Sequence, residues 1–107
     1  MTAPNYTLFA NLLDEIETPS DGILSKPIFT DERLRITLFG MSAGQEMSEH
    51  TTSMEAIVHF LEGEIEVTIE GNVHTAKAGT WALMSPRVPH SLRAKTASKF
   101  CLTILRK

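Results

Sequence analysis

The stretch that decides the fold runs from residue 44 to residue 63 and reads GQEMSEHTTSMEAIVHFLEG. It opens on Gly44, places His50 at the start of an extended segment, and closes an apolar run at Gly63. Glycine supplies the backbone angles that tight turns need, whereas Val, Ile and Phe favour strands. We therefore expect strands around His50 bounded by glycine turns, with the rest of the chain built around them.

Alternating apolar and polar residues extend this pattern on both sides. Residues 34–39 and 65–70 both alternate with a period of two, which is typical of half-buried strands. In the second run we expect the Ile and Val side chains to be less exposed than the Glu and Thr side chains. Gly71-Asn72 predicts a tight two-residue hairpin turn directly after it.

Further short apolar segments complete an all-β pattern. Residues 23–29 contain Pro27, which predicts an edge strand or a bend because proline cannot donate a backbone hydrogen bond. Residues 81–84 are followed by the proline-rich SPRVPH, a stiff loop into His90. Residues 100–105 are apolar on both faces, so both faces must be covered. Eight to ten short strands separated by glycine and proline turns indicate a β-sandwich or barrel.

The N-terminal part predicts a short amphipathic helix over residues 5–17. Asn5 is a candidate cap and Pro19 a candidate stop. The apolar residues with the i, i+3, i+4, i+7 spacing of one helical face are Phe9, Leu12, Leu13 and Ile16. We expect residues 1–33 to form an N-terminal extension with the first edge strand, and residues 34–107 to form the barrel core of a single domain.

Composition excludes several classes of function. The 107 residues carry a net charge of −3, and their ten Lys and Arg residues are scattered, which argues against a duplex nucleic-acid partner. No apolar run approaches the length of a membrane-spanning helix, so no membrane partner is expected. The lone Cys101 cannot form an intramolecular disulfide, and no basic, apolar leader is evident. These features predict a soluble cytoplasmic protein.

The spacing around His50 resembles the first motif of the cupin family. Five residues separate Gly44 from His50, Thr52 stands next but one, and Ala56 and Gly63 complete the frame. In the family motif the position of Thr52 is a second histidine and the position of Ala56 is a glutamate. The frame is therefore present, but half of its metal ligands are replaced.

A second cupin motif is matched from Gly79 onward. Its glycine and its histidine are present as Gly79 and His90, fifteen residues separate the two motifs, and that distance is the length of one hairpin. Ser85, Arg87 and Ala94 stand where the family has proline, glycine and asparagine. The chain thus resembles a small single-domain cupin of the cupin 2 conserved barrel type, with degenerate metal-binding motifs.

The resemblance implies a double-stranded β-helix, or jelly roll, with His50 and His90 converging at the mouth of the barrel. On a continuous strand Thr52 and Ala56 would share the face of His50, whereas Glu55 would point the other way. The residues expected to line a ligand pocket are His50, Thr52, Ala56, Val58, Phe60, Trp81, Met84 and His90.

Three classes of function remain open. The first, which we favour, is a cupin that binds a small molecule in the barrel mouth. The second is a metal-dependent dioxygenase or isomerase that uses His50 and His90 to hold zinc, nickel or iron, although catalytic zinc usually has three protein ligands and non-haem iron needs a carboxylate. The third is a metal-free enzyme with a histidine as acid or base. A homodimer is expected because the apolar stretches at residues 23–29 and 100–105 exceed what one small barrel covers.

Overall fold

The computed structural model describes residues 5–106, and within that range it contains nine strands and one turn of 3-10 helix. The elements in chain order are η1 (Leu12–Glu15), β1 (Ile23–Thr30), β2 (Leu34–Met41), β3 (Glu46–His50), β4 (Glu55–Glu62), β5 (Ile65–Ile69), β6 (Asn72–Ala76), β7 (Trp81–Met84), β8 (His90–Ala94) and β9 (Ser98–Leu105).

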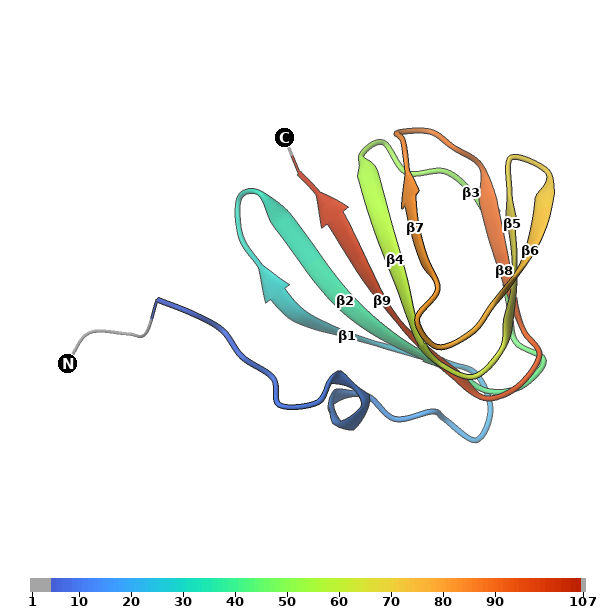
Figure 1. Ribbon diagram of the computed structural model, residues 1–107, viewed down its shortest axis with the longest axis horizontal. Helices are drawn as coiled ribbons and strands as arrows, with labels where there is room; N and C mark the ends of the chain where they lie inside the picture. The colour runs from blue at the N-terminus through green and yellow to red at the C-terminus, as the bar shows by residue number, and fades with distance from the viewer. Residues whose placement is uncertain (1–4, 107) are drawn as a thin grey trace.

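The strands form two antiparallel sheets that face each other (Figure 1). One sheet has the order β1-β2-β9-β4-β7, and the other has the order β3-β8-β5-β6. Strands that are distant in the sequence are neighbours in both sheets, as in β2-β9-β4 and β3-β8-β5. The predicted all-β jelly roll is confirmed. No helix among residues 5–106 is long and apolar enough to cross a membrane.

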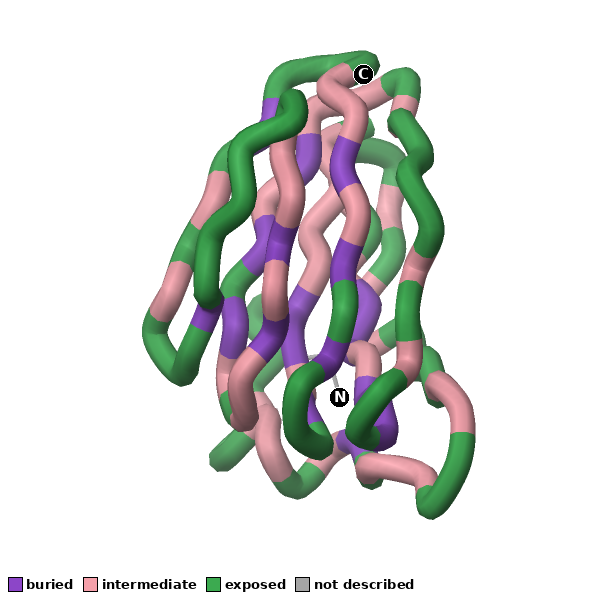
Figure 2. Tube along the Cα trace, turned by 90° about the vertical axis from the view of Figure 1, so that its right-hand side faces the viewer, coloured by how far each residue is buried: buried purple, intermediate pink, exposed green. Residues whose placement is uncertain are grey.

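The core lies between the sheets and is built from alternate residues of each strand, so that buried positions recur along the tube in Figure 2. Phe100 of β9 is at its centre: it stacks on Phe39 with ring centroids 4.9 Å apart and contacts Phe60 at 5.8 Å. Burying each large apolar side chain contributes about 1.5–3 kcal/mol, so this cluster is a major source of stability.

Strand β5 has the predicted facing. Ile65 and Val67 are buried, whereas Glu66 and Thr68, which alternate with them, are partly exposed. The tight hairpin after β5 exists, but its central residues are Glu70 and Gly71, one position earlier than predicted.

The hairpin turn follows from the backbone angles of those two residues. Glu70 and Gly71 have φ values of 50° and 80°, as a type I′ turn requires at both central positions. Asn72 is already paired with Ile69 across the hairpin. The Asn side chain therefore does not mark the turn here, and Glu70 adopts the left-handed conformation in its place.

The predicted helix over residues 5–17 is wrong, because only Leu12–Glu15 is helical and it is a single 3-10 turn. The side chain of Asn11, not Asn5, accepts the hydrogen bond that caps it, and Ile16 is already extended. Leu12 and Ile16 pack against the outer face of the five-stranded sheet. The apolar spacing is satisfied by that sheet contact, so the costly nucleation of a longer helix is not needed.

Two further expectations about strands are confirmed. Strand β1 is the edge of its sheet, and its pairing with β2 is interrupted between Pro27 and Phe29. Strand β9 lies between β2 and β4, with Phe100 facing the core. Its other face carries Cys101, which packs with Leu38 and Ile16 beneath the N-terminal segment.

Candidate functional site

Two histidines meet where β3 ends and β8 begins. His50 is the last residue of β3, His90 is the first residue of β8, and the two are cross-strand partners. Directly opposed residues of an antiparallel pair project from the same face of the sheet. The two imidazole centroids are 4.2 Å apart, with the rings inclined at 63°. We call His50 and His90 the histidine pair.

Each imidazole is held by a backbone carbonyl two residues earlier. Nδ1 of His50 is 2.8 Å from the oxygen of Ser48, and Nδ1 of His90 is 2.9 Å from the oxygen of Val88. A carbonyl oxygen can only accept, so Nδ1 is the donor in both rings. In the neutral form of each ring the unshared electron pair is therefore on Nε2, which can accept a hydrogen bond or bind a metal ion.

The loop that leads into His90 is fixed by two backbone hydrogen bonds. The N–H of Arg87 donates to the oxygen of Thr52 at 2.7 Å, and the N–H of Glu70 donates to the oxygen of Pro89 at 2.9 Å. These bonds tie residues 85–89 to the loop after His50 and to the end of β5. Arg87, at the position of the motif glycine, has a φ of 66°, a value that glycine adopts readily and arginine does not.

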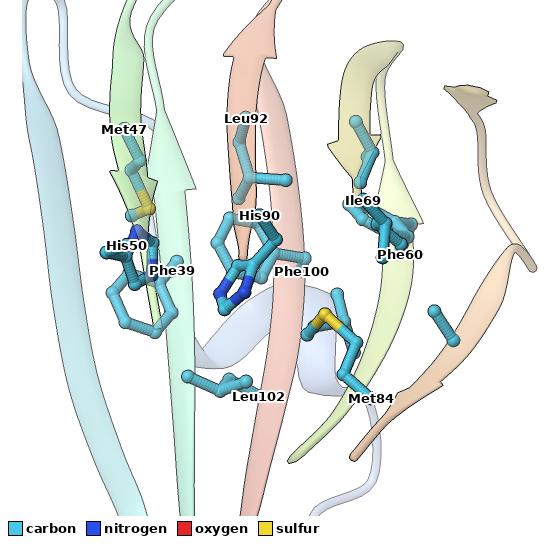
Figure 3. A pocket seen from close by; sticks show the side chains of 13 residues that line it. Phe39, Met47, His50, Phe60, Ile69, Met84, His90, Leu92, Phe100 and Leu102 are labelled. Atoms are coloured by element: carbon cyan, nitrogen blue, oxygen red, sulfur yellow. The ribbon is translucent and has the colours of Figure 1, made fainter. Parts of the chain in front are cut away.

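The histidine pair lies at the wall of an apolar cavity of about 250 Å³ between the sheets (Figure 3). We call it the barrel cavity. His50 and His90 are its polar lining residues, and the former is exposed while the latter is buried. The apolar lining residues are Phe39, Met47, Val58, Phe60, Val67, Ile69, Ala82, Met84, Leu92, Phe100 and Leu102.

Of the eight residues expected in the pocket, five line the barrel cavity, namely His50, Val58, Phe60, Met84 and His90. Thr52, Ala56 and Trp81 do not. Thr52 lies in the loop of residues 51–54, and its hydroxyl donates to the oxygen of Met54. The expected continuous strand from His50 to Ala56 is wrong, because this loop breaks the alternation on which the shared face depends.

Ala56 and Trp81 are placed differently from each other. Ala56 is buried in the core, 1% exposed, but is not among the lining residues. Trp81 is 56% exposed and lines an adjoining depression with His74. Its neighbour Ala82 lines both this depression and the barrel cavity. Val67, Ile69 and Ala82 also line the barrel cavity, although the sequence interpretation did not include them. The alternation with a period of two in residues 65–69 and 81–84 could have identified them.

The residues present do not fit a complete metal site of the kind that the fold family implies. Within residues 5–106 no group of three or more His, Cys, Asp or Glu side chains lies close enough to share an ion. The histidine pair offers two Nε2 donors, whereas catalytic zinc generally takes three protein ligands and the facial iron site needs a carboxylate. Ala56, at the position of the motif glutamate, has no donor atom.

Comparison with known proteins supports the fold and its family. No curated protein matches the chain significantly. A conserved protein of unknown function from Streptococcus pyogenes is 27% identical, with a TM-score of 0.85 over 97% of this chain and 91% of the other. An RmlC-like cupin from Desulfovibrio desulfuricans is 28% identical, with a TM-score of 0.81 over 94% and 97% of the two chains.

More distant structures share the fold alone. Salicylate 1,2-dioxygenase from Pseudoaminobacter salicylatoxidans is 22% identical, with a TM-score of 0.73 over 87% of this chain and 29% of that enzyme.

The Cupin domain family matches residues 37–105, which is more than half of the sequence and includes β3, β4, β8 and both histidines. With a jelly roll, two glycine-framed motifs and this family match, the chain belongs to the cupin family.

Proposed function

We propose that this cupin binds a small, largely apolar molecule in the barrel cavity, with the histidine pair contacting a polar group of the ligand. The observation that carries the proposal is the composition of the cavity wall, where eleven apolar residues surround two imidazoles. Ligand sites combine an apolar wall with a few polar groups in this way. At about 250 Å³ the cavity is slightly below the usual range of about 300–1,000 Å³, which favours a compact ligand.

A metal-dependent reaction is the second candidate, because both imidazoles are held at Nδ1 with Nε2 free, as in metal-binding histidines. The dioxygenase among the structural neighbours is too distant in sequence to extend its chemistry to this chain. The absence of a third metal ligand among residues 5–106 argues against a metal-dependent reaction. We therefore expect only weak binding of zinc, nickel or iron.

Thermal unfolding with and without small ligands tests the proposal. A ligand that binds only the folded state raises its stability by RT ln(1 + [L]/Kd), so the unfolding temperature should rise with ligand concentration. Toluene, indole and hexanol cover ring and chain shapes of suitable size. We expect at least one of them to raise the unfolding temperature progressively.

A pair of variants on one strand provides the control. Ala82→Phe fills the barrel cavity and should abolish the ligand-induced rise, whereas Leu83→Phe adds a ring on the exposed side of β7 and should retain it. Circular dichroism establishes that both variants fold. The proposal fails if no compound stabilises the wild type, or if Ala82→Phe is folded and responds as strongly as the wild type does.

A homodimer and a cytoplasmic location remain predictions. Strand β9 is partly covered by the N-terminal segment, so the best candidate for a self-association surface is the edge strand β7. Trp81 and Leu83, 56% and 51% exposed, are spaced two apart on this edge strand. Light scattering should give about twice 11.9 kDa for the wild type and a smaller mass for Trp81→Ser. A wild-type monomer at micromolar concentration would contradict the dimer.

A further inference from the structure

We propose that the ligand of the barrel cavity is a neutral compound with one aromatic ring and one hydroxyl group, a member of the phenol class, whose hydroxyl donates to a free Nε2 of the histidine pair. This inference rests on the proposed function, because it specifies the ligand of the same cavity. Size, the residues of the wall and the hydrogen-bonding state of the histidines support it separately.

The size of the barrel cavity matches one substituted ring. An apolar cavity of about 150 Å³ is known to hold benzene, so about 250 Å³ accommodates a benzene ring with one or two small substituents. Two fused rings with substituents, or a sugar, would need more space or more polar partners. Among residues 5–106, the polar side chains in the wall are those of His50 and His90.

The wall also favours an aromatic ligand. Phe39, Phe60 and Phe100 all line the cavity, and Phe39 and Phe100 stack with an interplanar angle of 9°. Aromatic rings pack favourably edge-to-face or offset against such a cluster. Met47 lies beside His50 and Met84 lies beyond His90 in Figure 3, and the flexible thioethers of both can adapt to a ring in the cavity.

The histidine pair selects a ligand that donates a hydrogen bond. Both Nδ1 atoms already donate to the carbonyls of Ser48 and Val88, so a neutral His50 or His90 presents an acceptor at Nε2. A carboxylate needs donors, and no Lys, Arg, Ser or Thr is among the lining residues from the part of the chain that the structure describes. A neutral hydroxyl supplies the donor without bringing a charge into an apolar wall.

Calorimetric titration of the wild type with three compounds of one shape tests this inference. The compounds are p-cresol, p-xylene and 4-methylbenzoate, which place a hydroxyl, a methyl or a carboxylate at the same position on toluene. All three titrations use the same buffer at about pH 8. We expect p-cresol to bind about fivefold to tenfold more tightly than p-xylene, because one hydrogen bond is gained, and 4-methylbenzoate to bind most weakly.

Two cavity variants and one matched control identify the acceptor. His50→Leu and His90→Leu remove one acceptor each, and at least one of them should make p-xylene the tighter ligand, since a buried hydroxyl without a partner is unfavourable. His59→Leu makes the same change on β4 at an exposed residue that does not line the cavity, and should keep the wild-type order. The comparison within the wild type holds even if a variant does not fold.

The outcomes separate this inference from the proposed function. Tighter binding of p-xylene or of 4-methylbenzoate than of p-cresol would overturn the phenol class while leaving a small-molecule cavity intact. An unchanged preference for p-cresol in both folded histidine variants would overturn the assignment of the acceptor. Binding of none of the three compounds, together with no stabilisation by the broader set above, would overturn both proposals.

Discussion

Replacing Arg87 with glycine should stabilise the protein. Arg87 is at the position where the second cupin motif has glycine, and its φ is 66°. This left-handed conformation raises the free energy of a residue with a Cβ by about 1–2 kcal/mol. Its N–H nevertheless donates to Thr52 at 2.7 Å, so the loop must keep this conformation. Glycine removes the steric cost and preserves the backbone hydrogen bond.

The net effect is smaller than the steric cost, because glycine also gives the unfolded chain more freedom. That entropic cost is about 0.4–1 kcal/mol. We therefore expect Arg87→Gly to raise the free energy of unfolding by about 0.5–1 kcal/mol, which corresponds to a few degrees in unfolding temperature. In urea the midpoint should increase with an unchanged slope.

Two controls isolate the backbone effect. Arg87→Ala removes the same side chain but keeps a Cβ, so its stability should stay near that of the wild type. Ser85→Gly, in the same loop at a residue without positive φ, should lower stability by about 0.4–1 kcal/mol. If Arg87→Gly lowers stability as Ser85→Gly does, the claim that Arg87 is strained is refuted. The explanation of the motif glycine by backbone strain is then refuted too.

Three further predictions concern other parts of the chain. Glu70→Asn places Asn-Gly in a turn whose two central residues have positive φ, so it should raise unfolding stability by about 0.5–1 kcal/mol; a decrease would contradict the turn assignment. The pKa of Asp31 is lowered, chiefly because the N–H of Leu34 donates to its carboxylate, so the ionised form stabilises the fold. Asp31→Ala should be less stable than the wild type at pH 7, and this difference should shrink as the pH falls from about 4 through the lowered pKa of Asp31; a difference independent of pH would count against it. Elemental analysis of protein purified without an affinity tag should find far less than one transition metal ion per chain, and stoichiometric metal that is lost in both His50→Ala and His90→Ala would promote the enzyme alternative.

Much of the fold could be predicted because most strands are half-buried, so that apolar and polar residues alternate along them. Ile65 and Val67 face the core as their spacing requires, and the joint spacing of two glycine turns and two histidines identifies the family. The N-terminal segment could not be predicted in the same way. Its apolar spacing suits both a helix and a sheet contact, and the outer sheet face that decides between them is formed by residues far along the chain.

The candidate site was harder to predict, for local reasons. The sequence does not reveal that residues 51–54 form a loop, since Thr and Ser are compatible with both strand and turn. Consequently Thr52 leaves the face of His50. The inward residues of β7 are Ala82 and Met84, whereas Trp81 lies on the exposed side of this edge strand. Size and hydrophobicity alone favour the opposite assignment.

The most direct test of the cavity uses the methionine methyl groups as reporters. Met47 and Met84 line the barrel cavity, whereas Met54 borders a different depression on the protein. In protein labelled with carbon-13 at the methionine methyls, an aromatic ligand inside the cavity shifts nearby signals through its ring current. With p-cresol we predict saturable shifts of Met47 and Met84 and an unchanged Met54. Signals of Met47 and Met84 that stay in place at saturating p-cresol, or that move no more than the signal of Met54, would contradict binding in the barrel cavity.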